Sequence, residues 1–156
     1  MEEIRVPIQR QPDCEDIPFP RYMTENAAGM DIYAAVKNEI SMMPGERLLV
    51  PTGIHIAIPK GYEAEIRPRS GLAIHYGVTL LNSPGTIDAD YRGEIGVIMI
   101  NLGQAPFPIK RGDRIAQMII RRVCHVAWLE CSELESSARG NGGFGHTRIN
   151  DEGASF

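Results

Sequence analysis

Apolar and polar residues alternate along much of this chain with the two-residue period of β-strands. The alternation over residues 30–34 sends Asp31 to the face opposite its neighbours, where it would be taken for a surface carboxylate. Residues 54–58 and 62–66 each gather apolar side chains on one face, which predicts two further strands. Residues 95–100 are apolar on both faces, so this strand is expected to be covered on both sides, with another subunit as one possible cover.

A polar stretch, residues 85–93, separates the apolar segments 78–81 and 95–100, and this order predicts a β-hairpin. The stretch holds two carboxylates, and an ordinary surface turn would account for each of them singly. Ile87 and Tyr91 are interleaved with these carboxylates, and a plain turn has no use for such side chains. A carboxylate beside an aromatic ring on a rigid hairpin suits a base that activates water next to a flat substrate.

Residues 67–77 change character and predict one short helix over residues 70–76. Ser70 is a favourable N-cap, and Gly77 can end the helix. Arg67 and Arg69 precede the helix, where fixed positive charge and free backbone amides suit a phosphate group. The alternative is a salt-bridged strand end followed by a capped helix.

The region after residue 112 is harder to interpret. Residues 113–139 contain neither glycine nor proline; their periodicity fits a helix and their β-branched content fits strands, so the pattern alone leaves both open. Trp128 is expected in the core or in an interface on either interpretation. Residues 138–156 form a glycine-rich arm, predicted to be mobile and separate from a single β domain over residues 1–137. A plain tail is the alternative, but Phe144 between glycines suggests an arm that orders over a ligand.

Composition supports an all-β fold, because 16 glycines and 11 prolines among 156 residues cut the chain into short elements. The net charge of −4 provides no basic field for nucleic acid or an anionic membrane. No apolar run approaches the roughly 20 residues of a membrane span. Three cysteines without metal-site spacing indicate reduced thiols in a cytoplasmic protein, with Cys124 packed as a small hydrophobic residue.

Together these segments resemble the trimeric dUTPases, the deoxyuridine triphosphate nucleotidohydrolases. The resemblance covers about residues 25–148 and rests on five motifs in the family's order. The motifs are Ala28–Asp31, Arg67–Ala73, Gly85–Gly93 with Asn82 ahead of it, Arg111–Gln117 and Arg139–Gly145.

The resemblance implies a distorted jelly-roll-like β-barrel with one short helix, and it assigns residues 113–139 mostly to strand. It implies a homotrimer whose active sites are shared between subunits and closed by the arm. The implied reaction is hydrolysis of dUTP to dUMP and pyrophosphate with Mg²⁺, by in-line attack of water at the α-phosphate. This reaction keeps uracil out of DNA and supplies dUMP for dTMP synthesis.

The resemblance also assigns roles to residues. Asp88 is the general base, Tyr91 packs against the deoxyribose, and Asp31 contacts the metal through water only. The implied substrate-binding residues are Arg69, Ser70, Gly71 and Gln117 for the phosphate chain, Asn82, Gly85, Thr86 and Ile87 for the uracil edge, and Arg139, Phe144, Gly145 and Thr147 from the arm. Where the family has Ser-Thr-Gly after Gly-Phe-Gly, this chain has His146-Thr147-Arg148, so His146 or Arg148 would replace the usual serine contact.

Two other functions are weighed against this one. The dCTP deaminases share the fold but need a carboxylate poised at the amino group of the base, and the Asp-x-Asp-Tyr hairpin and Gly-Gly-Phe-Gly arm speak against them. A non-catalytic nucleotide-binding regulatory module would lack the base or the arm, and this chain has both.

Overall fold

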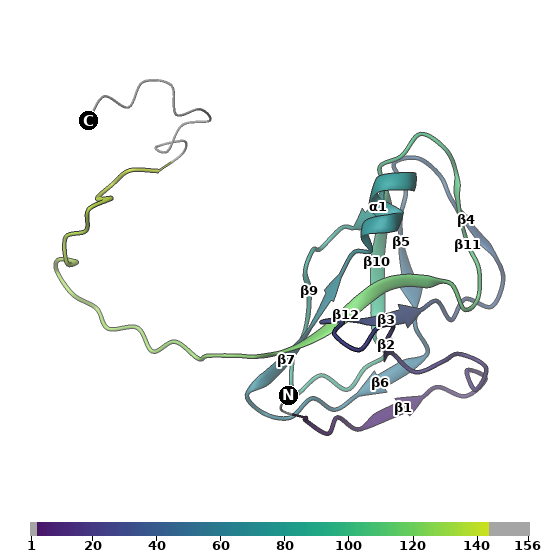
Figure 1. The fold of residues 1–156 in the computed structure, drawn as a ribbon, viewed down its shortest axis with the longest axis horizontal. Helices are drawn as coiled ribbons and strands as arrows, with labels where there is room; N and C mark the ends of the chain where they lie inside the picture. Colours follow the sequence, from purple (N-terminus) through teal and green to yellow (C-terminus); the bar gives the residue numbers. More distant parts are fainter. Residues whose placement is uncertain (1–2, 144–156) are drawn as a thin grey trace. The chain divides into compact units, whose positions relative to one another are not determined.

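A computed structural model describes residues 3–143, which hold twelve β-strands and one helix. The chain divides into two units, residues 1–124 and 125–156, and every strand and helix belongs to the first. The predicted all-β fold with one short helix is confirmed (Figure 1). The predicted domain boundary at residue 137 lies inside the second unit and stays a prediction.

The largest sheet has five strands in the order β2-β3-β12-β7-β9. Its strands are β2 (Arg21–Tyr22), β3 (Met30–Tyr33), β12 (Arg114–Arg122), β7 (Tyr62–Arg67) and β9 (Gly85–Ile87). The central strand, β12, pairs antiparallel with β3 on one side and with β7 on the other. Gln117 of β12 therefore lies opposite Asp31 on one side and opposite Arg67 on the other.

The remaining strands form three smaller antiparallel sheets. A three-stranded sheet has the order β5-β10-β8, and two pairs are formed by β1 with β6 and by β4 with β11. These strands are β1 (Ile8–Arg10), β4 (Ile40–Met42), β5 (Arg47–Pro51), β6 (Ile54–Ile56), β8 (Val78–Leu80), β10 (Gly96–Asn101) and β11 (Phe107–Ile109). Within residues 3–143 the pairings give four open sheets and no closed barrel.

The larger of two apolar clusters is enclosed by the sheets, and the predicted alternation supplies much of it. Ile54, Ile56 and Ile58 are all buried, as their shared face predicts. On β10 the side chains of Val97, Met99 and Asn101 are buried, whereas the alternate positions are only half-buried. We expected this strand to be covered on both faces. In the single chain, only one face of β10 is fully buried.

Helix α1 (Ser70–Tyr76) has the predicted extent. Its N-cap is Arg69, without a side-chain capping bond, so Ser70 is the first helical residue and its predicted N-cap role is wrong. Gly77 ends the helix with a left-handed φ of 68°, and its amide donates to Leu72 and Ala73. A Cβ at Gly77 would lie 2.7 Å from the backbone of Gly103, so both conformation and space require glycine here.

Three expectations for the region after residue 112 are corrected. Strand extends only over 114–122, and residues 123–139 form neither strand nor helix, so the mostly-strand assignment is wrong. Trp128 is 93% exposed, so the core alternative is wrong and the interface alternative stays a prediction. Cys124 is exposed, and Cys14 is the buried cysteine.

Within the described part of the chain, no helix is long and apolar enough to cross a membrane.

Asn101 is the buried polar residue on which the loops around β10 depend. Its side-chain amide donates to the carbonyl oxygens of Met42 and Ala105, each at 2.9 Å, and its oxygen accepts from the amide of Gly103 at 2.9 Å. Asn101→Ala should lower the free energy of unfolding by about 3 kcal/mol, because several backbone groups lose their partners. Urea unfolding measures this, with the exposed Asn38→Ala as control. Equal stability of the two variants would contradict this role.

Candidate active site

The stretch 85–93 is more ordered than a hairpin turn. β8 and β10 pair antiparallel as predicted, but Gly85–Ile87 between them forms β9 and pairs with β7 in the other sheet. Thr86 lies opposite Glu65, and Ile87 lies opposite Ala64. The stretch therefore bridges two sheets, which fixes the backbone just ahead of Asp88.

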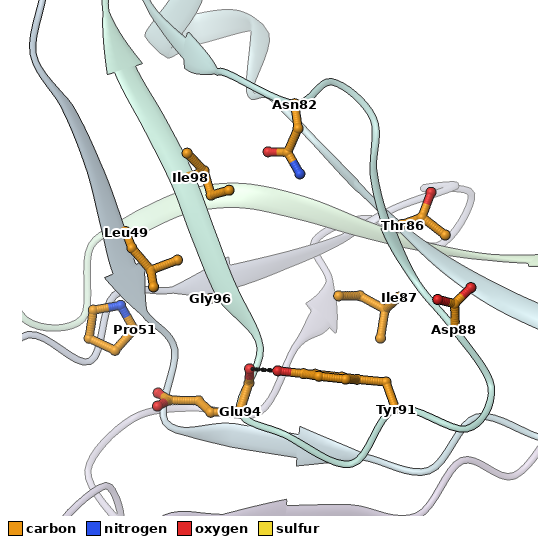
Figure 2. Close-up of a pocket in the computed structure, with 10 residues that line it drawn as sticks. All are labelled: Leu49, Pro51, Asn82, Thr86, Ile87, Asp88, Tyr91, Glu94, Gly96 and Ile98. Atoms are coloured by element: carbon orange, nitrogen blue, oxygen red, sulfur yellow. Dashed lines mark hydrogen bonds between the residues drawn. The ribbon is translucent and has the colours of Figure 1, made fainter.

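A cavity of about 360 Å³ opens beside β9 and β10 (Figure 2). Its lining residues are Leu49, Pro51, Asn82, Thr86, Ile87, Asp88, Tyr91, Glu94, Gly96 and Ile98. The Asn82 side chain lies close over the backbone of Gly85, where a Cβ would come within 3.1 Å of its Nδ2. This cavity gathers the residues expected to bind the nucleoside together with the expected general base.

Asp88 lies at this cavity with an exposed side chain. Within residues 3–143, no hydrogen bond or ion pair to its carboxylate is recorded, whereas the backbone around it is well bonded. The Tyr91 amide donates to the Asp88 carbonyl at 3.1 Å, and Arg92 donates to the carbonyls of Ala89 and Tyr91 at 2.7 Å each. A rigid loop thus presents a free carboxylate.

Tyr91 is held at both ends of its side chain. Its ring lies against Gly93, where any Cβ would collide with the ring and the hydroxyl. The Tyr91 hydroxyl donates to the carbonyl oxygen of Glu94 at 2.9 Å (Figure 2). The ring is therefore a fixed wall of the cavity.

A second cluster is centred on Asp31, whose predicted surface position is wrong, because only 2% of it is exposed. Arg114 Nη1 donates to Asp31 Oδ2 at 3.2 Å, and Gln117 Nε2 donates to Asp31 Oδ1 at 3.1 Å. Arg69 Nη2 lies 3.6 Å from Asp31 Oδ2, while Arg69 Nη1 donates to the Arg114 carbonyl at 2.9 Å. One buried carboxylate thus orients two guanidinium groups and an amide.

Arg67 does not join this cluster. It forms an ion pair with Glu65 on its own strand, in which Nε donates to Glu65 Oε2 at 2.8 Å. Arg121 donates to the other oxygen of Glu65 at 3.2 Å. The hydrogen bond from Arg67 lowers the pKa of Glu65, and the positive charge of Arg121 lowers it further. Of the two arginines ahead of α1, Arg69 is therefore the one placed beside Asp31, and Arg67 matches the salt-bridged alternative.

A second cavity, of about 410 Å³, adjoins the Asp31 cluster. Its lining residues are Arg69, Leu72, Tyr76, Phe107, Pro108, Lys110, Asp113, Arg114 and Ile115. Ser70 and Gly71 are exposed at the start of α1. This cavity shares no lining residue with the first, so Arg69, one of the expected phosphate-binding residues, lies at a different cavity from the residues expected to bind the nucleoside.

The remaining expected site residues come from the arm. In the unit 125–156, Arg139 belongs to a turn in which its Nε donates to the Gly142 carbonyl at 2.7 Å. The Gly140 amide donates to the Ser137 carbonyl at 3.0 Å in the same turn. Phe144, Gly145 and Thr147, and with them His146 and Arg148, lie outside the described residues.

No metal-binding group is evident in residues 3–143, where no cluster of three or more His, Cys, Asp or Glu side chains could hold an ion. Each Asp31 oxygen already accepts a hydrogen bond from the protein. The described residues thus do not fit a resident magnesium ion held by protein ligands.

Glu94 is a site residue that the sequence pattern did not reveal. Its Oε1 accepts from the Gly53 amide at 2.8 Å and its Oε2 from Gln11 Nε2 at 2.9 Å. His55 is half-buried, and its Nδ1 lies 3.0 Å from the Arg92 carbonyl. These partners are distant in the chain, and the only signal in the sequence is an acidic residue ahead of an apolar strand.

Comparison with known proteins bears on this site. The family described as dUTPase matches residues 15–148. This chain belongs to the dUTPase family. Deoxyuridine 5'-triphosphate nucleotidohydrolase of Caldanaerobacter subterraneus subsp. tengcongensis is 58% identical over 142 residues, covering 91% of this chain and 96% of the relative. The protein of the same name from Wolbachia sp. subsp. Brugia malayi is 55% identical over 145 residues, covering 92% and 93%.

Solved dUTPases share the fold. The dUTPase of Staphylococcus bacteriophage 80alpha with dUpNHpp superposes with a TM-score of 0.81 at 22% identity, covering 92% of this chain and 98% of that one. The dUTPase of phage phi11 of S. aureus, described with a structural Mg(II) ion, gives a TM-score of 0.75 at 20% identity, covering 85% and 100%. The predicted jelly-roll-like fold is thereby confirmed.

The Glu65 ion pairs should make stability depend on pH. Because the pKa of Glu65 is lowered in the folded state, its contribution to stability is present above the ordinary glutamate pKa and is lost as the pH falls through the folded value. The free energy of unfolding should therefore differ between wild type and Glu65→Gln by a constant amount at neutral pH, and this difference should shrink below about pH 4.3. Urea unfolding at several pH values measures it, with Glu63→Gln as control on the same strand. A difference that persists unchanged at pH 3 would refute the assignment.

Proposed function

We propose that the protein is a dUTP diphosphatase, which hydrolyses dUTP to dUMP and pyrophosphate. The observation that carries this proposal is the exposed Asp88 carboxylate, which lies at the first cavity beside Tyr91 and has no recorded partner within residues 3–143. Family membership and the name of the relatives support a uracil deoxynucleoside triphosphate as the substrate.

In this mechanism Asp88 is the general base. It accepts a proton from a water molecule while the oxygen of that water attacks the α-phosphorus in line with the leaving group. The bond from the α-phosphorus to the oxygen that bridges to the β-phosphorus breaks, and pyrophosphate leaves with the bonding electrons. The free state of the Asp88 carboxylate supports this role, because a carboxylate already held in an ion pair would be a poorer proton acceptor.

The first cavity would bind the nucleoside. Asn82 and the backbone of Gly85, Thr86 and Ile87 would read the uracil edge. Three of these residues line the cavity, and Gly85 lies against the Asn82 side chain. Tyr91 would pack against the deoxyribose. Its fixed ring leaves no space for a ribose 2′-hydroxyl, which would give preference for the deoxynucleotide.

The Asp31 cluster would bind the phosphate chain. Arg69 and Gln117 are held in place by the buried carboxylate, and Ser70 and Gly71 follow directly at the start of α1. Donors that are fixed before the substrate arrives stabilise developing negative charge without reorganisation. Arg114, on the same carboxylate, would add positive charge.

Magnesium would enter with the substrate, as the ion of a Mg²⁺–dUTP complex, because Mg²⁺ is commonly bound through substrate phosphates and water. A water-mediated contact from Asp31 to the ion stays part of the proposal, although both Asp31 oxygens already have protein partners.

The active protein would be a cytoplasmic homotrimer with sites shared between subunits. The separation of the two cavities in one chain supports this, since a neighbouring subunit could bring the nucleoside half to the phosphate half. The half-covered face of β10 and the 69% exposure of Leu49 leave apolar surface for such contacts. The arm would supply Arg139 for the terminal phosphate, Phe144 for stacking on the base, and contacts from Gly145 and Thr147.

The proposed reaction would keep uracil out of DNA and supply dUMP for dTMP synthesis. A dCTP deaminase would need its carboxylate at the amino group of the base, whereas here Asp88 follows β9 and lies beside the ring expected under the sugar. A non-catalytic module would have no use for such a free carboxylate.

Asp88→Asn should keep the fold and nucleotide binding but lower kcat by about 10²–10⁴-fold, because the amide cannot accept the proton. Pyrophosphate release from dUTP, dCTP, dTTP and UTP in the presence of magnesium measures turnover and preference together. Asp90→Asn, two residues along the same loop, is the matched control and should stay close to wild type. A variant Asp88→Asn within about threefold of wild type would refute the general base.

Subunit mixing tests the shared site. Asp88→Asn and a chain that stops after Ser137 should each be inactive, and exchange of their subunits should restore activity. In a cyclic trimer that contains both variants, one of the three sites combines an intact Asp88 from one subunit with an intact arm from another. Equal random mixing should return about a quarter of wild-type activity, since about three-quarters of trimers are mixed and each has about a third of its sites intact. No recovery after verified exchange would contradict the shared site.

A further inference from the structure

Glu94 joins Tyr91 of the candidate site to Gln11 and Gly53, which lie outside the first cavity, through its three acceptor oxygens. Its carboxylate accepts from the Gly53 amide at 2.8 Å and from Gln11 Nε2 at 2.9 Å. Its backbone carbonyl accepts the hydroxyl hydrogen of Tyr91 at 2.9 Å. Figure 2 shows the carboxylate directed away from Tyr91, so side chain and backbone of this residue hold different partners.

The two anchors of the carboxylate are themselves joined. The backbone N–H of Gln11 donates to the Gly53 carbonyl at 2.8 Å, which ties the N-terminal segment to the turn ahead of β6. Glu94 therefore fixes the end of the loop 88–94 to the N-terminal segment and to the turn at Gly53, both of which lie outside this loop. The loop end is where the Tyr91 hydroxyl is bound.

This arrangement determines where the Tyr91 ring stands. The ring already lies against Gly93, so the hydrogen bond to the Glu94 carbonyl sets its remaining freedom to tilt. The Ile95 amide, which belongs to the same planar peptide group as the Glu94 carbonyl, donates to the Ile54 carbonyl at 3.0 Å, and the Ile95 carbonyl accepts from Thr52 Oγ1 at 2.6 Å. These bonds hold β10 and one end of that peptide group without Glu94. Loss of the Glu94 carboxylate should therefore leave β10 folded and free the peptide group to rotate about its Ile95 end, which moves the carbonyl that holds the ring.

We infer that Glu94 is a positioning residue for sugar specificity, acting on the nucleotide only through Tyr91. The inference rests on the proposed function, in which the Tyr91 ring excludes a ribose 2′-hydroxyl. Steric exclusion of one oxygen atom works only if the excluding group cannot move aside. The anchored carbonyl supplies that rigidity, and the carboxylate supplies one of its two anchors, the other being the bond from the Ile95 amide to Ile54.

The test is the ratio of kcat/KM for dUTP to kcat/KM for UTP. Glu94→Ala and Tyr91→Phe should each lower this ratio by about tenfold, the effect of one net hydrogen bond. The double variant should be no worse than the poorer single variant, because both changes break the same connection. Glu94→Gln, whose amide oxygen can still accept from Gly53, should keep most of the ratio.

Glu46→Ala is the matched control. The Glu46 carboxylate also accepts a hydrogen bond from a nearby backbone amide, that of Met43 at 2.8 Å, but it lies outside both cavities. It should cost similar stability and leave the dUTP to UTP ratio unchanged. A ratio retained in Glu94→Ala, or additive losses in the double variant, would overturn the inference while leaving the proposed function intact.

A binding measurement separates this inference from the proposed function. The Kd ratio of UMP to dUMP, measured by calorimetry, reports the Tyr91 ring without any turnover. If the wild type fails to hydrolyse dUTP but prefers dUMP, and Glu94→Ala loses that preference, the inference stands and the proposed reaction fails. A wild type with no preference for dUMP over UMP would overturn the inference.

Discussion

The antiparallel pairing of β12 with both β3 and β7 is the constraint on which the candidate site depends. This single strand places Gln117 opposite Asp31 on one side and opposite Arg67 on the other. It also determines where β7 stands, and β7 in turn pairs with β9, which leads directly into Asp88. A slip of one residue would turn Gln117 to the other face of the sheet and separate it from Asp31. The register of one ladder therefore determines the geometry of both halves of the site.

Electrostatics explains why the Asp31 cluster is held together without a ligand. A buried carboxylate such as Asp31 is unfavourable unless charged and polar donors surround it. Arg114 and Gln117 satisfy its oxygens, and Arg69 stands within ion-pair distance while also bonding the Arg114 carbonyl. The need to neutralise Asp31 thus keeps the guanidinium groups together, although they would repel each other alone. Glu65 on β7 does the same for Arg67 and Arg121.

The loop that carries Asp88 and Tyr91 follows a different principle. Several polar groups of the loop from Asp88 to Glu94 are bonded within the protein: Arg92 closes the turn, Tyr91 bonds the Glu94 carbonyl, and Glu94 bonds Gly53 and Gln11. The carboxylates of Asp88 and Asp90 have no recorded partner within residues 3–143, and of these two Asp88 is the one that lines the first cavity. Rigidity around an unsatisfied carboxylate is the arrangement expected of a proton acceptor that must meet a water molecule and not a protein group.

Local pattern in the sequence determined the strands over residues 30–33, 54–56, 62–67 and 96–101 and the end of the helix at Gly77, because alternation and a glycine C-cap depend on neighbouring residues. The motif resemblance, and not the pattern, assigned roles to Asp88 and Tyr91. Pattern failed where a partner lies far along the chain: Asp31 is buried because Arg114 and Gln117 reach it from 83 and 86 residues away. Glu94 likewise meets Gln11 across 83 residues and Gly53 across 41. The β-branched run after residue 112 became strand only as far as Arg122, where its pairing with β7 ends. Such contacts depend on strand order and register, which only the folded chain determines.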